Sequence, residues 1–379
     1  MAIVTGDHSD KSAEGKNVAK NRLIILEWGF DRNSINPPSL IHKLLSSVGA
    51  EMGFKELRVR RVIDRIPKLI WMSIALKDNF LVVPHPFVFK SLVLRGKRSA
   101  LLFMCRKLEL RLWRRILSRN RGAVFVYDEP VDQRLMLYED SYNMGGGRIL
   151  EDKSRALEKG FLELFDVLLV LGDEHRLALE GQYGLGGKHF EYYKFNEMFS
   201  SLNVEKGARG KVYRVGYVSS ILSKSTWLLK LHKLSKRVFL YGDANGMKRE
   251  FEKRGMRCMG IMGHDDLIKS LNENCEFGLI FYNEGAERYF NRFASAKLTS
   301  YLLAGIPVLY KPSYTHISNL SREYGIGLSV DNVEGIGETL AKLDDRAYRN
   351  LCKNCFDLGK RISQGEFTKA AIERALERL

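Results

Sequence analysis

Short apolar runs alternate along this chain with segments whose apolar residues recur at helical spacing. Nine of these runs predict buried strands, and each is followed by a turn or helix signal. Strands that alternate with helices are typical of parallel sheets with helical crossovers. We therefore predict an α/β protein with two Rossmann-like domains. The predicted strands cover residues 23–26, 80–83, 123–127 and 166–171, and then 212–218, 238–241, 277–281, 307–310 and 327–330.

The segment 281–311 carries the densest signal, because a strand, a polar loop, a helix, a glycine and a second strand follow one another there. Leu298 and Leu302 stand on one face of the predicted helix, which Gly305 ends. Lys297 lies in the first helical turn, where the macrodipole favours anions over cations. A lysine beside free helix N–H groups suits a phosphate. The alternative is a lysine that only extends into solvent.

Residues 296–308 read AKLTSYLLAGIPV, which resembles the KLxxYLxAGxPV signature of the nucleotide-binding domain of GT-B glycosyltransferases. Bacterial hexosyltransferases of the galactofuranosyl- and glucosyltransferase type are the nearest in pattern, and inverting glucuronosyltransferases are more distantly similar. The resemblance extends weakly over about residues 23–343. It implies that the two domains face a cleft and that Lys297 contacts the diphosphate of a nucleotide sugar.

The resemblance also implies a plan for the domains. Residues 1–20 have the composition of a disordered tail. Residues 21–200 would form the acceptor-binding domain and residues 201–345 the nucleotide-sugar-binding domain, with the polar segment 196–211 as the linker. The C-terminal helices, in residues 346–379, would cross back to the first domain.

Residues that directly follow the strands of the second half are candidates for donor binding, because ligands of parallel sheets bind beyond the carboxyl ends of the strands. Turn formation is the alternative role for these residue types. His264 opens a predicted helix, and the loop before Lys297 carries cationic and aromatic side chains that could reach a diphosphate or a base. The candidate donor-binding set is Lys297, Ser219, Ser220, Gly242, His264, Asn283, Tyr289, Arg292 and Ser300.

Asp128 is the candidate catalytic residue, since the strand at 123–127 delivers it to the carboxyl edge of the first domain. An inverting transfer needs one carboxylate there to take the proton from the acceptor hydroxyl. A turn-forming aspartate ahead of Pro130 is the alternative. Glu129 and Asp132 are alternates for the same role.

Retaining relatives often carry two glutamates around the glycine motif, at positions that hold Arg292 and Ser300 here. The resemblance therefore favours an inverting single displacement. The sequence has no D-x-D motif for a divalent metal, so we expect a metal-independent reaction in which Lys297 and the helix N-terminus neutralise the diphosphate. No cofactor is expected, because the nucleotide sugar is a substrate. Candidate acceptor-side residues follow the first strand and are Trp28, Gly29 and Asp31.

The composition adds a strong positive charge, with 61 Lys and Arg against 45 Asp and Glu, a formal net charge of +16. The stretch 55–121 alone holds 18 basic and four acidic residues. Within it an apolar stripe of helical period runs from Leu101 through Leu108 to Ile116, with Trp113 beside it. This helix could lie on an anionic membrane surface, or its stripe could be core. The excess of positive charge predicts an acidic partner in either case.

No run of about 18 apolar residues is present, and the first twenty residues lack the apolar core of a signal peptide. The five cysteines are too few and too scattered for a disulfide framework. We therefore expect a cytoplasmic protein that could sit at the inner face of the membrane. The expected partners are a nucleotide-sugar donor and a glycan or lipid-linked acceptor, without specific nucleic acid.

Two other functions stay open from the sequence. A pI near 9.5 and clustered arginines fit a nucleic-acid-binding protein, although no zinc finger, RNA-recognition motif or K-homology loop is recognisable. A nucleotide-sugar epimerase on the same fold would turn over the donor without an acceptor. The favoured hypothesis is a hexosyltransferase that moves a sugar from a UDP-sugar to a glycan or lipid-linked hydroxyl.

Overall fold

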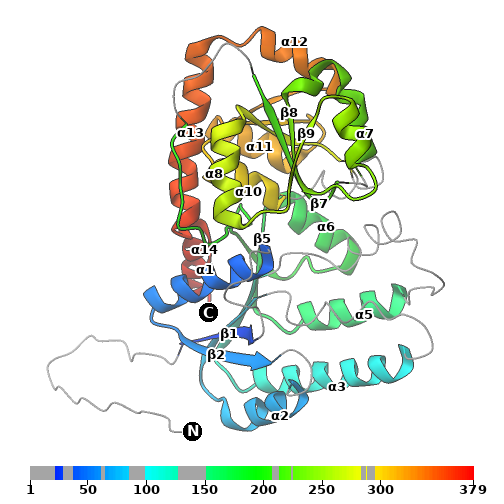
Figure 1. Cartoon of the computed structure of the whole chain (residues 1–379). Helices are drawn as coiled ribbons and strands as arrows, with labels where there is room; N and C mark the ends of the chain where they lie inside the picture. Colours follow the sequence, from blue (N-terminus) through cyan, green and yellow to red (C-terminus); the bar gives the residue numbers. More distant parts are fainter. Residues whose placement is uncertain are drawn as a thin grey trace, which may run out of the picture.

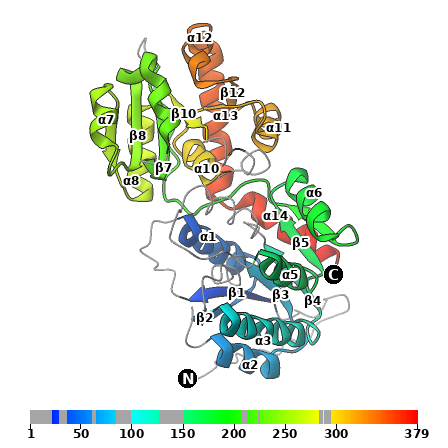
Figure 2. The ribbon, with the colours of Figure 1, turned by 90° about the vertical axis from the view of Figure 1, so that its right-hand side faces the viewer.

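The computed structural model describes residues 22–28, 37–60, 65–84, 99–126, 151–206, 213–222, 225–282, 287 and 295–379. The described chain folds into two parallel sheets of six strands each, which form separate layers in the lower and upper halves of Figure 1. Figure 2 shows the two halves from the side, with the C-terminal helices running from one to the other. The predicted tail, residues 1–20, lies outside the described residues.

The first sheet has the strand order β2-β1-β3-β4-β5-β6 and carries helices on both faces. In β4 (Gly122–Val126), Ala123 and Phe125 pack on one face with Trp113, whereas Val124 and Val126 pack on the other face with α1 (Pro37–Glu51). This alternation follows from the two-residue period of a strand. The other elements are β1 (Arg22–Trp28), β2 (Lys55–Arg60), α2 (Arg65–Ala75), β3 (Phe80–Pro84), α3 (Ser99–Leu117), α5 (Glu151–Leu162), β5 (Val167–Val170), α6 (Asp173–Tyr183) and β6 (His189–Tyr192).

The second sheet has the strand order β12-β11-β10-β7-β8-β9, and all its pairings are parallel. Its central strand β10 (Phe277–Ile280) is buried along its whole length. The other elements are β7 (Val215–Ile221), η3 (Thr226–Arg237), β8 (Val238–Asp243), α7 (Lys248–Lys253), β9 (Arg257–Gly260), α8 (His264–Asn274), α10 (Ala296–Leu303), β11 (Val308–Tyr310), α11 (Thr315–Tyr324), β12 (Gly327–Ser329), η4 (Val333–Gly335) and α12 (Ile336–Ala341).

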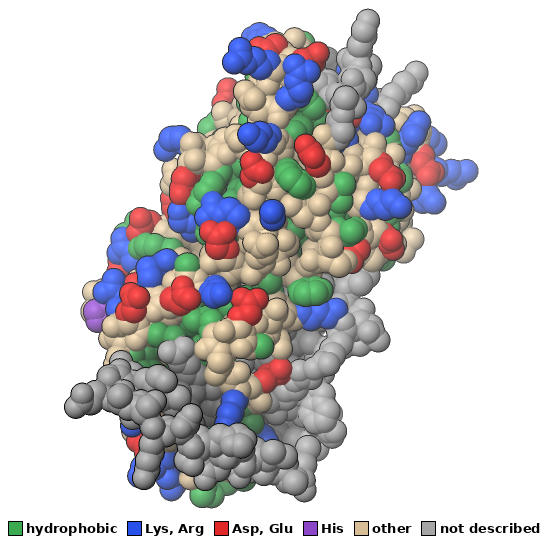
Figure 3. Space-filling model, turned by 90° about the vertical axis from the view of Figure 1, so that its left-hand side faces the viewer, with side chains coloured by type: hydrophobic (Ala, Val, Ile, Leu, Met, Phe, Trp, Pro, Cys, Tyr) green, Lys and Arg blue, Asp and Glu red, His purple; other side chains and the backbone are tan. Residues whose placement is uncertain are grey.

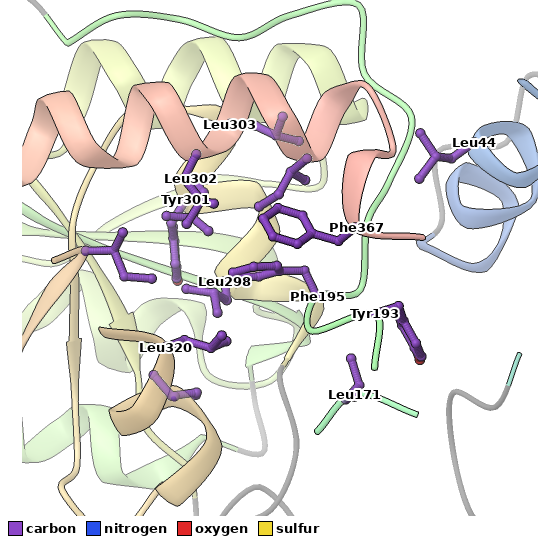
Figure 4. Close-up of a cluster of buried hydrophobic side chains, with 14 of the residues drawn as sticks. Leu44, Leu171, Tyr193, Phe195, Leu298, Tyr301, Leu302, Leu303, Leu320 and Phe367 are labelled. Atoms are coloured by element: carbon purple, nitrogen blue, oxygen red, sulfur yellow. The ribbon is translucent and has the colours of Figure 1, made fainter. Parts of the chain in front are cut away.

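Two C-terminal helices join the domains, α13 (Asp345–Ser363) against α10 and α14 (Glu366–Glu377) against the first sheet. The Glu197 carboxylate accepts hydrogen bonds from the backbone N–H groups of Phe367 and Thr368, at 3.1 and 2.7 Å, and so caps α14. Phe195 packs against Phe367 with 4.8 Å between ring centroids, and Figure 4 shows Phe195 between this ring and Leu298 of α10. The crossing therefore has its own apolar core.

All nine predicted strands are present, and the predicted α/β class with two Rossmann-like domains, the GT-B fold, is confirmed. Three strands were not predicted: β2, β6 and β9. Each of them is an edge strand of its sheet. Edge strands can keep polar side chains in solvent, so they lack the apolar run by which the buried strands are recognised.

The structure corrects the predicted stripe of the basic helix. In α3, Trp113 and Ile116 are fully buried, whereas Leu108, which the pattern places on the stripe, is 44% exposed. The side of α3 that packs into the core of the first domain is therefore centred on Trp113 and includes Ile116. No helix in the described part of the chain is long and apolar enough to cross a membrane.

Candidate functional site

Helix α10 sets the position of Lys297 in the second domain. Ser295 is its N-cap, and the Ser295 hydroxyl accepts a hydrogen bond from the Lys297 N–H at 3.2 Å. Leu298 and Leu302 are fully buried, which contributes about 1.5–3 kcal/mol per side chain to the packing of this short helix. The predicted helix is thus present, with its first turn at the carboxyl edge of the sheet.

Tyr301 fixes α10 to the two central strands. Its hydroxyl accepts from the Val218 N–H of β7 and donates to the Leu279 carbonyl of β10, both at 3.1 Å. Its ring lies on Gly278, where any Cβ would stand 2.3 Å from the Tyr301 Cγ. The absence of a side chain at residue 278 therefore permits α10 to approach the sheet this closely.

The Lys297 ammonium is held between two aromatic rings. Its Nζ donates to the Tyr217 hydroxyl at 3.0 Å and lies 4.3 Å from the Tyr217 ring centroid and 4.5 Å from that of Tyr282. Tyr217 comes from β7, and Tyr282 follows the end of β10. Cation–π contacts of this kind contribute about 0.5–2 kcal/mol each, so the ammonium is fixed at the strand ends instead of extending freely into solvent.

Further aromatic residues support the two tyrosines. The Tyr217 hydroxyl is 3.2 Å from the Ser225 hydroxyl, and Trp227 meets the Tyr217 ring edge-on at 5.0 Å between centroids. Burial raises the pKa of the Tyr282 hydroxyl well above its ordinary value, so this group stays neutral at physiological pH. Among the described residues, the Lys297 ammonium has these two tyrosines as its partners and no carboxylate within ion-pairing distance.

Ser219 and Gly242 lie against each other at the ends of β7 and β8. Gly242 has a φ of +134°, and a Cβ there would stand 1.6 Å from the Ser219 carbonyl oxygen. The register of the two strands shifts at this point, between Val218 and Ile221. The structure thus brings together two of the predicted donor-binding residues. Ser220 belongs to β7, but its side chain lies outside the described atoms.

His264 opens α8 and is 7% exposed. Burial lowers the pKa of this imidazole, and the Lys43 ammonium of α1 acts in the same direction, whereas Asp265 opposes it. Its Nε2 is buried without a hydrogen-bond partner in the part of the chain that the structure describes. A neutral imidazole with an unused nitrogen can donate to or accept from a ligand.

Ser300 is buried, and its hydroxyl donates back to the Ala296 carbonyl in its own helix at 3.4 Å. Trp28 is the last residue of β1, and nothing is described of its side chain. The remaining predicted site residues lie outside the described residues: Asp128 with its alternates Glu129 and Asp132, the donor-side Asn283, Tyr289 and Arg292, and the acceptor-side Gly29 and Asp31.

Sequence reasoning places Tyr301 on the buried face of the helix but misses the hydrogen bonds of its hydroxyl, and it misses the contributions of Tyr217 and Ser295. A Ser two residues before Lys297 is a recognisable N-cap signal. Tyr217 offers no such signal, because it stands inside an apolar strand and its contact with Lys297 spans 80 residues. Within the described ranges, no group of three or more His, Cys, Asp or Glu side chains could hold a metal ion.

Comparison with known proteins bears on this second domain. Residues 215–375 match the family model described as "Glucosyltransferase 3-like, C-terminal domain". Glucosyltransferase 3 of Streptococcus gordonii is 31% identical over 84 residues, which are 22% of this chain and 25% of that protein. The matched segment thus spans about a quarter of the length of this curated relative.

Two solved structures cover nearly all of the chain at low identity. A DNA-modifying β-glucosyltransferase, studied with and without uridine diphosphoglucose, is 13% identical and covers 94% of this chain and 99% of its own, with a TM-score of 0.49. The catalytic domain of starch synthase IV from Arabidopsis thaliana, bound to ADP and acarbose, is 10% identical and covers 93% and 100%, also with a TM-score of 0.49.

The twin parallel sheets and their crossing C-terminal helix define a protein of the GT-B class. Its second domain resembles the C-terminal domain of glucosyltransferase 3-like proteins, and the resemblance predicted from the segment around Lys297 is confirmed.

Proposed function

We propose that the protein is a hexosyltransferase, which moves a sugar from a nucleotide diphosphate sugar, a UDP-sugar in our proposal, to an acceptor hydroxyl. The observation that carries this proposal is the position of Lys297. Its ammonium is held at the N-terminus of α10 and at the carboxyl ends of β7 and β10, within the segment that matches the glucosyltransferase family model. A cation and helix N–H groups together suit a diphosphate.

The donor would lie along the strand ends of the second domain. The close approach of Ser219 and Gly242 presents backbone to the phosphates, and His264 provides an imidazole nitrogen for the nucleoside. As the bond between the anomeric carbon and the diphosphate oxygen breaks, negative charge grows on the leaving group. Lys297 and the first turn of α10 would stabilise that charge, so the reaction needs no metal in this proposal.

The acceptor side of the proposal comes from the sequence. The Asp128 carboxylate takes the proton from the acceptor hydroxyl while the hydroxyl oxygen attacks the anomeric carbon from the face opposite the leaving nucleotide. One displacement of this kind inverts the anomeric configuration. The proposed acceptor is a glycan or a lipid-linked sugar, and the proposed location is the cytoplasm, at the inner face of the membrane. The high positive charge of the chain supports this location.

Calorimetry with UDP tests the donor site. Lys297→Ala is expected to weaken UDP binding by about 1.5–3 kcal/mol, the scale of a hydrogen bond to a charged group. Lys269→Ala, which removes an exposed lysine of α8, is the matched control and should leave the affinity unchanged. Equal UDP affinity of wild type and a folded Lys297→Ala variant would remove the proposal.

A nucleotide-sugar epimerase would use the same donor site and is separated by the need for an acceptor. Incubation of the wild type with UDP-glucose alone should leave the sugar configuration unchanged by NMR. Conversion of the donor in the absence of any acceptor would favour the epimerase.

A further inference from the structure

Helix α2 exposes large apolar side chains on its outer face. Ile70 and Trp71 are each 44% exposed and Ile74 is 62% exposed, at i, i+1 and i+4 spacing. Four of the seven large apolar side chains that the described chain exposes belong to α2 and its neighbour α3. The Lys68 ammonium lies 4.4 Å from the Trp71 ring centroid, so a cation accompanies the most amphipathic of these side chains.

Helix α3 packs alongside α2 and carries exposed positive charge. Arg111 and Arg115 are exposed together with Leu108, whereas the helix's acidic residue, Glu109, is buried. Arg119, two residues after the end of α3, donates to the Ser73 carbonyl of α2 at 2.6 Å and joins the two segments. We define the α2–α3 face by the exposed side chains of Ile70, Trp71, Ile74, Leu108, Arg111 and Arg115.

Charge and apolar character together select the occupant of this face. A second copy of the same face would bring arginines against arginines, which repel one another. Nucleic acid would pair with the arginines but would leave Ile70 and Ile74 without an apolar partner. An anionic lipid surface satisfies both, because its headgroups attract the arginines and its acyl boundary receives apolar side chains and the Trp71 ring.

The location of the face agrees with this occupant. Helix α2 lies at the end of the first domain that is farthest from the second domain, in both Figure 1 and Figure 2. On the face drawn in Figure 3, the second domain shows Lys and Arg interspersed with Asp and Glu. On that side the second domain therefore carries charges of both signs, whereas the exposed charges of α3 are all positive.

We propose that the α2–α3 face is a peripheral docking surface for an anionic lipid bilayer. Trp71 and Ile74 enter the headgroup region, and Arg111 and Arg115 lie against the lipid phosphates. That the bilayer also carries the acceptor rests on the proposed function, whereas the docking itself does not.

Co-sedimentation of the full chain with vesicles tests the docking surface. The wild type should bind vesicles of phosphatidylglycerol and phosphatidylcholine more strongly than phosphatidylcholine alone, and added salt should weaken the binding. Trp71→Ser/Ile74→Ser should lower the partition coefficient about tenfold. Arg111→Glu/Arg115→Glu should lower it about 25-fold or more, since each basic residue near the surface contributes about fivefold.

Matched controls use side chains of the second domain. Ile261→Ser changes an isoleucine that is 73% exposed, and Lys353→Glu reverses an exposed charge of α13; both should bind vesicles like the wild type. UDP affinity of all four variants should be unchanged, so a failed donor site and a failed docking surface give different results. Equal vesicle binding by wild type and both α2–α3 variants would overturn the proposal. A wild-type dimer lost in Trp71→Ser/Ile74→Ser, or duplex DNA binding without vesicle binding, would also overturn it.

Discussion

The ring of Tyr301 occupies the space that a side chain at Gly278 would need. A Cβ at residue 278 would lie 2.3–2.5 Å from three ring carbons, well inside van der Waals contact. Through this contact and its hydroxyl hydrogen bonds, Tyr301 sets the height of α10 over the sheet. The position of the Lys297 ammonium therefore depends on a glycine in a buried strand, 19 residues earlier in the chain.

Gly278→Ala is expected to destabilise the protein by about 1–3 kcal/mol, because the added methyl overlaps the Tyr301 ring and overpacks the core. UDP binding should weaken as well, since α10 must shift. Gly181→Ala in α6 is the control, because a Cβ there meets no atom within 4 Å and alanine favours a helix. Urea unfolding and calorimetry measure the two effects. A Gly278→Ala variant as stable as the wild type would show that α10 is not fixed by this contact.

Tyr217→Phe removes the hydroxyl that accepts from the Lys297 Nζ and keeps the ring under the ammonium. We expect UDP affinity to fall by about 0.5–1.5 kcal/mol, the net contribution of one hydrogen bond, and therefore by less than in Lys297→Ala. Tyr213→Phe removes a hydroxyl that donates to the Leu343 carbonyl, away from Lys297, and should leave affinity unchanged. If Tyr217→Phe binds UDP as well as the wild type does, the hydroxyl does not position the lysine.

Asp128→Asn should lower turnover by about 100- to 10,000-fold, because the amide keeps the shape of the carboxylate but cannot accept the proton. Donor binding should be preserved, since the donor lies on the other domain in the proposal. Glu129→Gln and Asp132→Asn test the alternates in the same assay. Near-normal turnover of Asp128→Asn, or a product with the donor's anomeric configuration by NMR, would contradict an inverting role for this residue.

His175 should make stability depend on pH. Burial lowers the pKa of its imidazole to about 3, and the nearby His316 acts in the same direction. In the unfolded chain the same group titrates near about 6.5. Below about pH 6.5 the unfolded state binds a proton that the folded state excludes. The free energy of unfolding is therefore unaffected by His175 above about pH 6.5, and it falls as the pH is lowered towards 3, by up to about 1.4 kcal/mol per pH unit.

The comparison of His175→Asn with the wild type isolates this effect from other titrating groups. Asparagine retains an acceptor for the Leu171 N–H, which now approaches the His175 Nδ1 at 3.4 Å. Urea unfolding at pH 7.5 and pH 5.5 should show a smaller loss of stability in the variant. The control, His189→Gln, alters an exposed histidine of β6 and should lose as much as the wild type. A parallel loss in His175→Asn would contradict the prediction.

The sequence predicts the buried parts of this fold well and its edges poorly. β10 and β4 are continuous apolar runs, because both faces of a parallel sheet are covered. β2, with the sequence KELRVR, has the polar composition of an edge strand and belongs to the basic stretch 55–121, so its pattern does not predict a strand. Trp113 shows the same limit within α3, since the helical pattern places it beside the apolar stripe, whereas it is fully buried and Leu108 of the stripe is 44% exposed.

The candidate site shows a different limit. Lys297 could be predicted because its placement conflicts with the helix dipole, and Gly305 because helices end at glycine. The aromatic pair around the ammonium, Tyr217 and Tyr282, could not, because each stands in or next to an apolar strand where an aromatic residue is expected as core. Contacts between distant strands carry no local signature in a single sequence.

The packing of α14 on the first domain makes that domain depend on the last part of the chain to be synthesised. Arg374 and Arg378 pair with Glu191 of β6, and Leu379 fills the space over Gly122 of β4. On the ribosome these residues emerge only after the whole second domain has been made. The first domain is translated first, but the part of its sheet that α14 covers, over β4, β5 and β6, stays uncovered until the second domain has been translated. Completion of the first domain is in this way conditional on synthesis of the second, and a chain that stops before α14 would expose the apolar surface that α14 covers.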